Sequence, residues 1–410
     1  MKPTKKQFSL NPAASKHNCL SSPPTGGGPG RPRFRRRRWA LVAACCVAGL
    51  GLLALPAATG AESARKSPRT VVLDSRFAPL PDTLGDGVQQ FVDALEGCSN
   101  LKVTFAAPSH GTGILNAVNA GEVDLGIDLL ALEASGNSAL DQVLHLYGES
   151  VPFGPGVDEY LKWLTLGDGL DQLKRILVHK YGYHPRLEIV PVIANTAQAA
   201  GMSKIELTKA NFEVGFLMRS FGFGQPSLQR AFPQMSFIGA VGGGSANIIA
   251  GFFGTLNGDN CPGGGTCELQ AAEFVNPCID GNQLYKAGIA GTGVRYYYTT
   301  PWQSPATISF LFYRSDRFTA HELAALRRAR VTNVLDSRQR LEQANRACLR
   351  EIHEVYGQEI RDLPADVLAA LRPASHAVLE EMAEANQDFG CVLRSLQNYG
   401  KKHSAGHDDR

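Results

Sequence analysis

Hydrophobic and polar positions after residue 70 alternate between the period of a strand and the period of a helix. Leu84, Val88, Phe91 and Leu95 share one helical face, and shorter apolar runs flank that helix. The pattern predicts, in order, strand Val71–Asp74, helix Leu84–Gly97, strand Leu101–Phe105, helix Gly113–Ala120 and a strand ending at Ile127. Strands that alternate with helices indicate a parallel sheet with helices on both faces, so the fold class is α/β.

The second half of the chain continues this mixture. We expect a helix at Tyr160–Tyr181, then strands at Leu187–Ile193, Phe212–Arg219 and Ile308–Tyr313. Thr319-Ala-His-Glu322 has capping-box spacing and begins a helix that runs to about Tyr356. At 1.5 Å per residue that helix is roughly 50 Å long. It outreaches one small domain, so we expect it to lie across two.

One charged residue stands out in the stretch from Phe212 to Gly222. Arg219 follows Phe216, Leu217 and Met218 and cannot lose its charge. It must therefore reach water, pair with an acid or bind an anionic ligand. The first two possibilities are ordinary for an arginine in a strand, so the stretch alone does not decide between them.

The charge is divided unevenly along the 410 residues. The whole chain carries 41 basic and 38 acidic residues, but ten of the basic residues and none of the acidic ones lie within residues 1–61. The remainder has a net charge of about −7. A nucleic-acid-binding body needs a basic surface, so we expect no nucleic-acid partner.

The first 61 residues have the plan of a secretory signal peptide with a basic leader. Arg35 to Arg38 precede an apolar run from Trp39 to Leu55, and small residues up to Ala61 follow it. The run is shorter than the roughly 20 residues of a membrane span. We expect export to the periplasm with cleavage, with an uncleaved anchor as the alternative. The paired arginines leave both general secretion and twin-arginine export open.

An even number of cysteines follows the leader, as expected for disulfides in an exported chain. They are Cys98, Cys261, Cys267, Cys278, Cys348 and Cys391. The short Gly-rich loop from Cys261 to Cys267 favours pairing of its own ends, and Cys348 with Cys391 then joins two helical segments. A metal cluster is the rival, but no zinc spacing occurs.

Signals for enzyme chemistry are missing from the sequence. There is no Gly-x-Ser-x-Gly elbow and no His-Glu-x-x-His. Gly242-Gly-Gly244 is not followed by the Lys-Ser/Thr of a phosphate loop, and His110, His145 and His179 stand alone. We therefore expect a protein that is not an enzyme, with an exported hydrolase as a remote alternative.

Short motifs follow one another in a fixed order along most of the chain. In sequence they are Val151-Pro-Phe-Gly154, Tyr160-Leu-Lys-Trp163, Gly167-Asp-Gly-Leu170, Gln198, Met218-Arg219, Ala272-Glu-Phe-Val-Asn-Pro277 and Tyr296 to Pro305. Each is weak alone, but together they span about Val71 to Tyr399. In their order and spacing the chain resembles the extracytoplasmic solute receptors of TRAP (tripartite ATP-independent periplasmic) transporters, the DctP-like periplasmic substrate-binding proteins.

The resemblance implies a cluster-type periplasmic binding protein, with two α/β lobes around a ligand cleft and a long helix that spans both lobes. We expect residues 71–211 and 305–348 in lobe I, residues 212–304 and 349–399 in lobe II, and residues 400–410 as a polar tail. The function implied is capture of a small organic acid and delivery to a TRAP membrane permease. A degenerate relative that acts as a sensor or scaffold is the alternative.

The resemblance also names candidate binding residues. The Arg of Met-Arg grips the ligand carboxylate in that family and matches Arg219, whose guanidinium offers paired donors. Gln198 and Glu273 match residues that reach the ligand or a bound cation, so Na⁺ or Ca²⁺ is possible beside the ligand, with no other cofactor expected. Phe274 replaces the Trp that follows Glu273 in relatives.

Two aromatic residues complete the expected site. Phe153 and Trp302 match positions that line or back the cleft, although both also suit an ordinary core. Ala199 to Met202 stand where relatives have Gly-Gly-Trp after Gln198. We therefore expect a pocket that lacks one aromatic wall.

Overall fold

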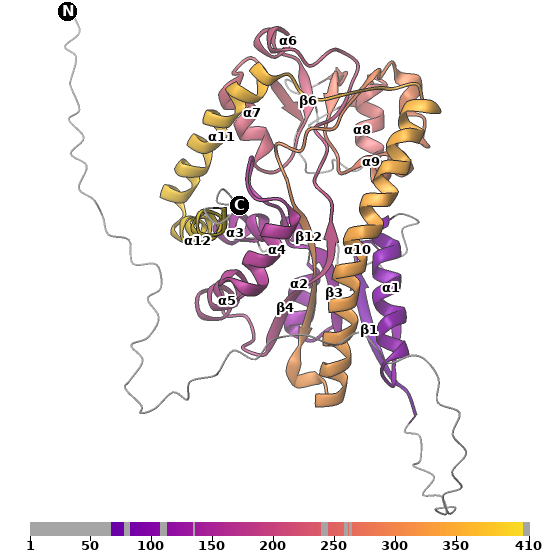
Figure 1. Cartoon of the computed structure of the whole chain (residues 1–410), viewed down its shortest axis with the longest axis vertical. Helices are drawn as coiled ribbons and strands as arrows, with labels where there is room; N and C mark the ends of the chain where they lie inside the picture. The colour runs from indigo at the N-terminus through magenta and orange to yellow at the C-terminus, as the bar shows by residue number, and fades with distance from the viewer. Residues whose placement is uncertain are drawn as a thin grey trace, which may run out of the picture. The chain divides into compact units, whose positions relative to one another are not determined.

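The computed structural model describes residues 67–77, 83–106, 113–133, 136–238, 245–257, 261 and 265–404. The chain divides into two compact units between Ser67 and Pro68, and the described helices and strands belong to the second unit (Figure 1). The predicted signal peptide lies outside the described residues. None of the helices in the described part of the chain is long and apolar enough to cross a bilayer.

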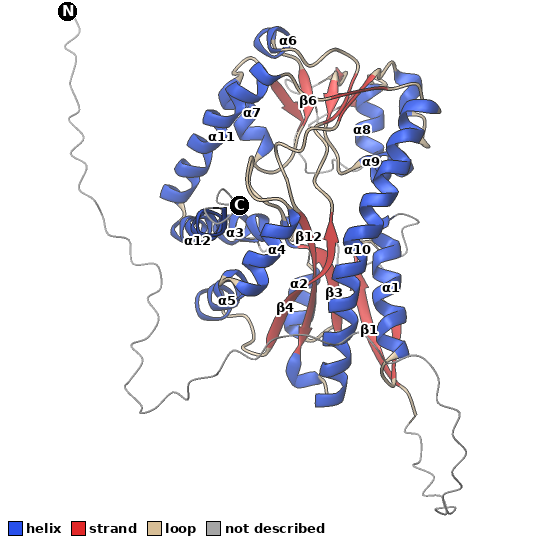
Figure 2. Ribbon diagram, viewed as in Figure 1, coloured by secondary structure: helices blue, strands red, loops and turns tan. Residues whose placement is uncertain are grey.

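Sheet A contains the strands predicted from the first half of the chain. Its order is β2 (Leu101–Phe105), β1 (Arg69–Ser75), β3 (Leu125–Leu129), β12 (Thr307–Arg314) and β4 (Leu187–Asn195). β1 runs parallel to β2 and β3, and β12 is antiparallel to its two neighbours. The predicted β-α-β-α-β opening is confirmed, and a returning strand from far along the chain completes the sheet (Figure 2).

Helices on both faces of sheet A cover two apolar cores. α1 (Thr83–Gly97) packs Val88 and Phe91 into one core. The other core includes residues of α2 (Ile114–Ala120), α3 (Ser138–Gly148), α4 (Val157–Leu166) and α5 (Gly169–Arg175). This burial on both faces explains why the strands of sheet A read as nearly continuous apolar runs.

Sheet B is built from shorter strands that are widely separated in the sequence. Its order is β13 (Glu359–Arg361), β11 (Tyr296–Tyr298), β5 (Gly201–Ser203), β10 (Ala271–Ala272), β6 (Leu217–Arg219) and β7 (Ser236–Ile238). Around it lie α6 (Lys209–Val214), α7 (Gly224–Ala231), α8 (Ser245–Phe252) and α9 (Pro277–Asp280). A separate pair, β8 (Leu256–Asn257) and β9 (Thr266–Cys267), forms a hairpin-like ribbon.

The long helix α10 (Ala320–Glu354) crosses from one sheet to the other (Figure 1). Its capping box forms as predicted, because the Thr319 hydroxyl accepts from Glu322 N and the Glu322 carboxylate accepts from Thr319 N. Leu326 packs in a core of sheet A, whereas Ile352 packs in a core of sheet B. The prediction of a helix that spans two lobes is confirmed.

Strand register brings one end of each sheet to a common junction. Leu129 pairs with Ser309 and Asn195 with Thr307, so the carboxyl ends of β3 and β4 lie where β12 begins. Two of the connections between the sheets, residues 196–200 and 299–306, lie at that end, and α10 makes a third. In sheet B, Arg219 pairs with Ala272 at the end from which the chain returns to sheet A. Residues after β6 and β10 therefore lie at the junction.

The strand predicted at Phe212–Arg219 is wrong in its first half. Thr208 caps a short helix, α6, by accepting a hydrogen bond from Asn211 N, and Phe212 is buried from that helix. Gly215 has a φ of +87°, a conformation that suits glycine and ends the helix. Only Leu217–Arg219 is a strand, because the aromatic side chains that suggested a strand suit a buried helix equally well.

The single helix predicted at Tyr160–Tyr181 is also interrupted. α4 ends at Leu166, α5 begins at Gly169, and a π-helix, Ile176–Lys180, follows α5. A Cβ atom at Gly167 would lie 2.5 Å from the Trp163 carbonyl oxygen, so only glycine fits this tight bend.

One of the two predicted disulfides is confirmed and the other is wrong. Cys261 pairs with Cys267, as the short loop suggested. Cys348 on α10 pairs with Cys278 on α9, not with Cys391. The two partners are 70 residues apart in sequence but 5.0 Å apart between Cα atoms. α9 packs against α10, a contact that the spacing of cysteines does not reveal.

Sheet membership departs from the expected lobe limits in two segments. β5 belongs to sheet B, so the first crossing lies within residues 196–200 and not after Asn211. α11 (Ala365–Ala385) packs Val367 beside sheet B, but α12 (Gln387–Ser404) packs Phe389 into a core of sheet A. The last helix, α12, therefore packs on the sheet A side.

Candidate functional site

Arg219 lies at the end of β6, at the junction of the two sheets. Only 6% of its surface is exposed. Its Nη1 donates to the Glu273 carbonyl oxygen at 2.6 Å and to Glu273 Oε1 at 2.8 Å. The contact follows from the sheet, because Arg219 pairs with Ala272 and Glu273 is the next residue. Two residues predicted for the site from the sequence thus form a buried ion pair.

Gln198 and Phe274 complete this cluster. The Gln198 amide nitrogen donates to Glu273 Oε2 and, at 2.6 Å, to the Phe274 carbonyl oxygen. The Phe274 ring centroid lies 5.6 Å from the Arg219 guanidinium carbon. Four of the six residues predicted from the sequence are therefore in contact around one guanidinium.

The other edge of the Arg219 guanidinium has no protein partner in the described part of the chain. Nε is buried without a hydrogen bond, and Nη2 makes none with a described residue. Nε and Nη2 form the side-on pair of donors that matches the two oxygens of a carboxylate. A buried donor without a partner is costly, so this edge is suited to an anionic ligand.

Two buried carboxyl groups set the charge around Arg219. Burial and, to a smaller extent, the charge of Glu149 raise the pKa of Glu273 to about 8 against the opposing charge of Arg219. Burial likewise raises the pKa of Asp280 to about 7, although Tyr297 Oη donates to it at 2.8 Å. Glu273 therefore binds a proton more readily than an exposed carboxyl group does, although the neighbouring Arg219 favours its charged form.

Phe153 and Trp302 lie together at a different place. Their ring centroids are 5.9 Å apart, and Phe153 N donates to the Trp302 carbonyl oxygen at 2.8 Å. Arg372 stacks on the Phe153 ring at 4.4 Å. Phe153 lines a surface groove of about 550 Å³ that also receives Arg372 and His376 from α11. Their ring contacts are thus outside the Arg219 cluster, and Trp302 is a core residue of the sheet B side.

The structure adds residues that the sequence did not single out. Glu149, at the end of α3, is 8% exposed, and its Oε2 lies 3.5 Å from His145 Nε2. The His145 ring packs against Phe221 at 5.0 Å, two residues after Arg219. Glu149 directly precedes the stretch Ser150-Val-Pro-Phe-Gly154, and this neighbourhood was the one available signal in the sequence.

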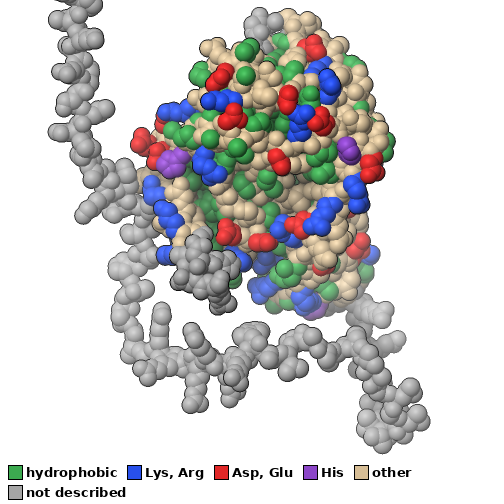
Figure 3. Space-filling model, turned by 45° about the horizontal axis from the view of Figure 1, so that its top comes forward, with side chains coloured by type: hydrophobic (Ala, Val, Ile, Leu, Met, Phe, Trp, Pro, Cys, Tyr) green, Lys and Arg blue, Asp and Glu red, His purple; other side chains and the backbone are tan. Residues whose placement is uncertain are grey.

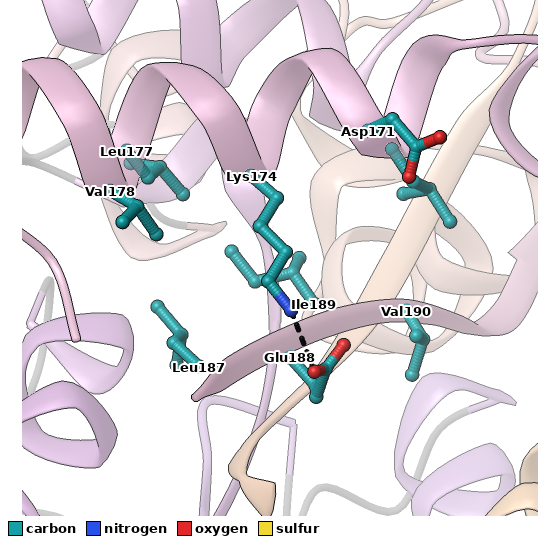
Figure 4. A pocket seen from close by; sticks show the side chains of 9 residues that line it. Asp171, Lys174, Leu177, Val178, Leu187, Glu188, Ile189 and Val190 are labelled. Atoms are coloured by element: carbon teal, nitrogen blue, oxygen red, sulfur yellow. Dashed lines mark hydrogen bonds and ion pairs between the residues drawn. The ribbon is translucent and has the colours of Figure 1, made fainter. Parts of the chain in front are cut away.

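A smaller hollow lies between α5, the π-helix and β4 (Figure 4). Its volume is about 170 Å³, and Lys174 Nζ crosses it to Glu188 Oε1 at 2.7 Å. Lys174 and Glu188 therefore pair with each other across it, and none of the predicted site residues lines it.

The oxygen atoms near Gln198 are of the chemical type that binds a hard cation. The Glu273 carboxylate and the Phe274 carbonyl are oxygen ligands of the type that Ca²⁺ prefers. The Gln198 amide nitrogen now binds both groups. Across the described residues, no three His, Cys, Asp or Glu side chains are grouped to hold a metal. Gln198 and Glu273 would thus hold a cation only with further oxygens from a ligand or water.

The surface of the described body carries both charges. Figure 3 shows one face, on which Lys and Arg side chains are interspersed with Asp and Glu and hydrophobic side chains. The net charge of the chain after the leader is about −7.

Comparison of the structure with solved proteins gives a consistent result. A TRAP periplasmic solute-binding protein from Pseudoalteromonas atlantica, solved with sodium and pyruvate, superposes with a TM-score of 0.66 at 21% identity, covering 82% of this chain and 95% of that one. A second, from Colwellia psychrerythraea with calcium and pyruvate, gives 0.67 at 20% identity and the same coverage. A third, from Bordetella bronchiseptica with calcium and picolinate, gives 0.63 at 19% identity, covering 82% and 93%.

No protein-family model matches the sequence, and no curated protein matches it significantly. The likeness is thus one of fold: the chain has the two-lobe α/β fold of the TRAP periplasmic solute-binding proteins, as the order of its motifs predicted.

Proposed function

We propose that this protein is a TRAP-type solute receptor that binds a small organic acid in the periplasm and delivers it to a membrane permease. The observation that supports the proposal is the side-on edge of Arg219, whose buried Nε has no partner in the described part of the chain. Charge-assisted, two-pronged hydrogen bonds to a carboxylate are strong in a site shielded from water. The junction between the sheets is also where closure of two lobes would enclose a ligand.

Binding and closure, without bond chemistry, are the working steps of such a receptor. The ligand stabilises the closed arrangement only to the extent that it binds that arrangement better than the open one. Contacts of the ligand with Arg219 and Glu273 on the sheet B side, and with Glu149 on the sheet A side, would provide this difference in affinity. The permease would then recognise and bind the closed form.

Export and a cation belong to the same proposal. The basic leader and apolar run within residues 1–61 would direct the chain to the periplasm and be cleaved. The similar proteins from Pseudoalteromonas atlantica and Colwellia psychrerythraea were solved with sodium and with calcium beside pyruvate. Gln198 and Glu273 would hold such a cation here.

The test is a thermal-shift screen of the purified protein against monocarboxylates and dicarboxylates, with and without Na⁺ and Ca²⁺. A ligand at 100 times its Kd should add about 2.7 kcal/mol to the free energy of unfolding. We expect stabilisation by a set of related carboxylates, and uncharged amides of the same acids serve as controls. If no carboxylate shifts the transition, the sensor or scaffold alternative replaces the proposal.

A further inference from the structure

A closed ring of contacts lies at the junction. Arg219 binds Glu273, Glu273 binds Gln198, and Ala199 follows Gln198 in the chain. The Gln303 amide nitrogen donates to the Ala199 carbonyl oxygen at 2.9 Å. Gly224 closes the ring. A Cβ atom at Gly224 would lie 3.2 Å from Gln303 Cβ and 3.3 Å from Ser220 Oγ. Ser220 directly follows Arg219 in the chain. These contacts hold Arg219, Ser220 and Gln303 in one region of the junction.

Three polar atoms on this ring are buried without a hydrogen bond. They are Arg219 Nε, Ser220 Oγ and Gln303 Oε1, on residues that are 6%, 1% and 4% exposed. Buried polar groups in proteins are rarely left without a partner. Three such atoms on one ring indicate that they bind a ligand. Arg219 Nε is a donor, Gln303 Oε1 is an acceptor, and Ser220 Oγ can be either.

The acceptor is fixed by the protein. Because Gln303 Nε2 faces the Ala199 carbonyl oxygen, which can only accept, Oε1 must be the amide atom left over. Glu149 supplies a second acceptor beside the same segment, since its Oε2 would lie 3.4 Å from a Cβ atom at Gly222. A simple carboxylate or oxo acid satisfies Arg219 but offers no hydrogen to Gln303.

Resting on the proposed function, we infer that the ligand carries a hydrogen-bond donor beside its carboxylate, as a 2-hydroxy acid or an amino acid does. Arg219 binds the carboxylate, and Gln303 Oε1 accepts from the hydroxyl or amino group. Gln303 is then the residue that determines specificity against 2-oxo acids of the same shape.

The experiment compares pairs of acids that differ only at carbon 2. The purified protein is titrated calorimetrically with glycolate and glyoxylate, with each enantiomer of lactate and pyruvate, and with 2-hydroxybutyrate and 2-oxobutyrate, in buffer containing Na⁺ and Ca²⁺. We expect the better hydroxy acid of the tightest pair to bind at least about tenfold more tightly, because a site built to bond a hydroxyl rejects an analogue without one.

Gln303→Met keeps the side-chain length and removes the acceptor, so it should reduce this preference to less than threefold. Gln358 provides a matched control. It is 2% exposed, its Nε2 donates to a backbone carbonyl, that of Tyr356, and its Oε1 has no partner, but it adjoins β13 at the far edge of sheet B. Gln358→Met should keep the wild-type preference.

Equal binding of hydroxy and oxo acids by the wild-type protein would overturn the inference while leaving carboxylate capture intact. A preference that survives in Gln303→Met would overturn the role of Gln303. Failure of these acids and of every carboxylate in the thermal-shift screen to bind would instead refute the proposed function. If Gln303→Met does not fold, the wild-type pairs still decide the ligand class.

Discussion

Two arginines in this protein each pair with a buried carboxylate, and they use their guanidinium groups differently. Arg76 donates from Nε and Nη2 to Asp128 at 3.1 and 2.8 Å, so its side-on edge is filled by the protein. Arg219 reaches Glu273 through Nη1, and its side-on edge meets no acceptor among the described residues. Both pairs lie at strand ends that face the junction.

The comparison shows that burial beside an acid does not by itself distinguish a structural arginine from a binding one. What distinguishes them is which donors the protein already uses. Arg76 links β1 to β3, because Asp128 lies on β3 and Arg76 directly follows β1. Arg219 retains the two donors that a carboxylate needs.

The largest effect is expected at Arg76. Arg76→Ala leaves the Asp128 carboxylate, which is 0% exposed, without its partner. The free energy of unfolding should fall by roughly 3–5 kcal/mol, as for other broken buried pairs. Urea denaturation measures it. Arg314→Ala removes a more exposed pair with Asp316 and should cost less than about 1 kcal/mol. A loss below 1 kcal/mol in Arg76→Ala would break the comparison.

The next effect concerns binding at Arg219. Arg219→Lys retains a positive charge for Glu273 but cannot offer the side-on pair of donors. Affinity for the best carboxylate from the screen should weaken by roughly 2–5 kcal/mol, the range for truncating one partner of a buried charged hydrogen bond. Calorimetry measures the affinity, and urea denaturation should show a smaller stability loss than in Arg76→Ala. Wild-type affinity in Arg219→Lys would refute the assignment.

The pH dependence of stability separates the two clusters. Burial, then the charge of Asp128, raises the pKa of Glu133 to about 9, whereas burial raises the pKa of Asp280, behind the Arg219 cluster, to about 7. A carboxyl whose pKa is higher in the folded chain binds more protons when folded. Its contribution to the free energy of unfolding therefore falls as pH rises from its unfolded to its folded pKa.

Each group contributes at most about 1.4 kcal/mol per pH unit. Relative to wild type, Glu133→Gln should flatten the decline from about pH 4.5 up to about pH 9, whereas Asp280→Asn should flatten it only up to about pH 7, so the two variants differ between pH 7 and 9. Denaturation midpoints at half-unit pH steps test this. The same window for both variants would contradict the separation.

The smallest effect is expected behind the ligand site. Tyr297→Phe removes the hydroxyl that donates to Asp280 Oδ2 at 2.8 Å. Stability at pH 8 should fall by about 0.5–1.5 kcal/mol, the net value of one hydrogen bond. Asp280 Oδ1 still accepts from Val275 N at 3.0 Å, so the segment after Glu273 should keep its place and carboxylate affinity should change less than twofold. A tenfold loss of affinity would instead make Tyr297 part of the binding site.

Local patterns in the sequence were enough to predict the α/β class, the opening strands and helices, and the capped helix that begins at Thr319. These features depend on periodicity and capping within one turn or one strand, which neighbouring residues encode. The order of motifs also led to the fold and to Arg219, Gln198, Glu273 and Phe274, which the structure brings into contact. The helix at Lys209–Val214 was missed because apolar aromatic runs suit both a strand and a buried helix.

Only the tertiary structure decided which distant segments meet. Cys278 pairs with Cys348 because α9 packs on α10, and Gln303 reaches Ala199 because residues 299–306 return beside residues 196–200. The register of β6 on β10 decides that Glu273 takes one edge of Arg219 and leaves the other. No periodicity records these contacts, because they arise from strand order and helix packing between residues that are 54 to 104 positions apart.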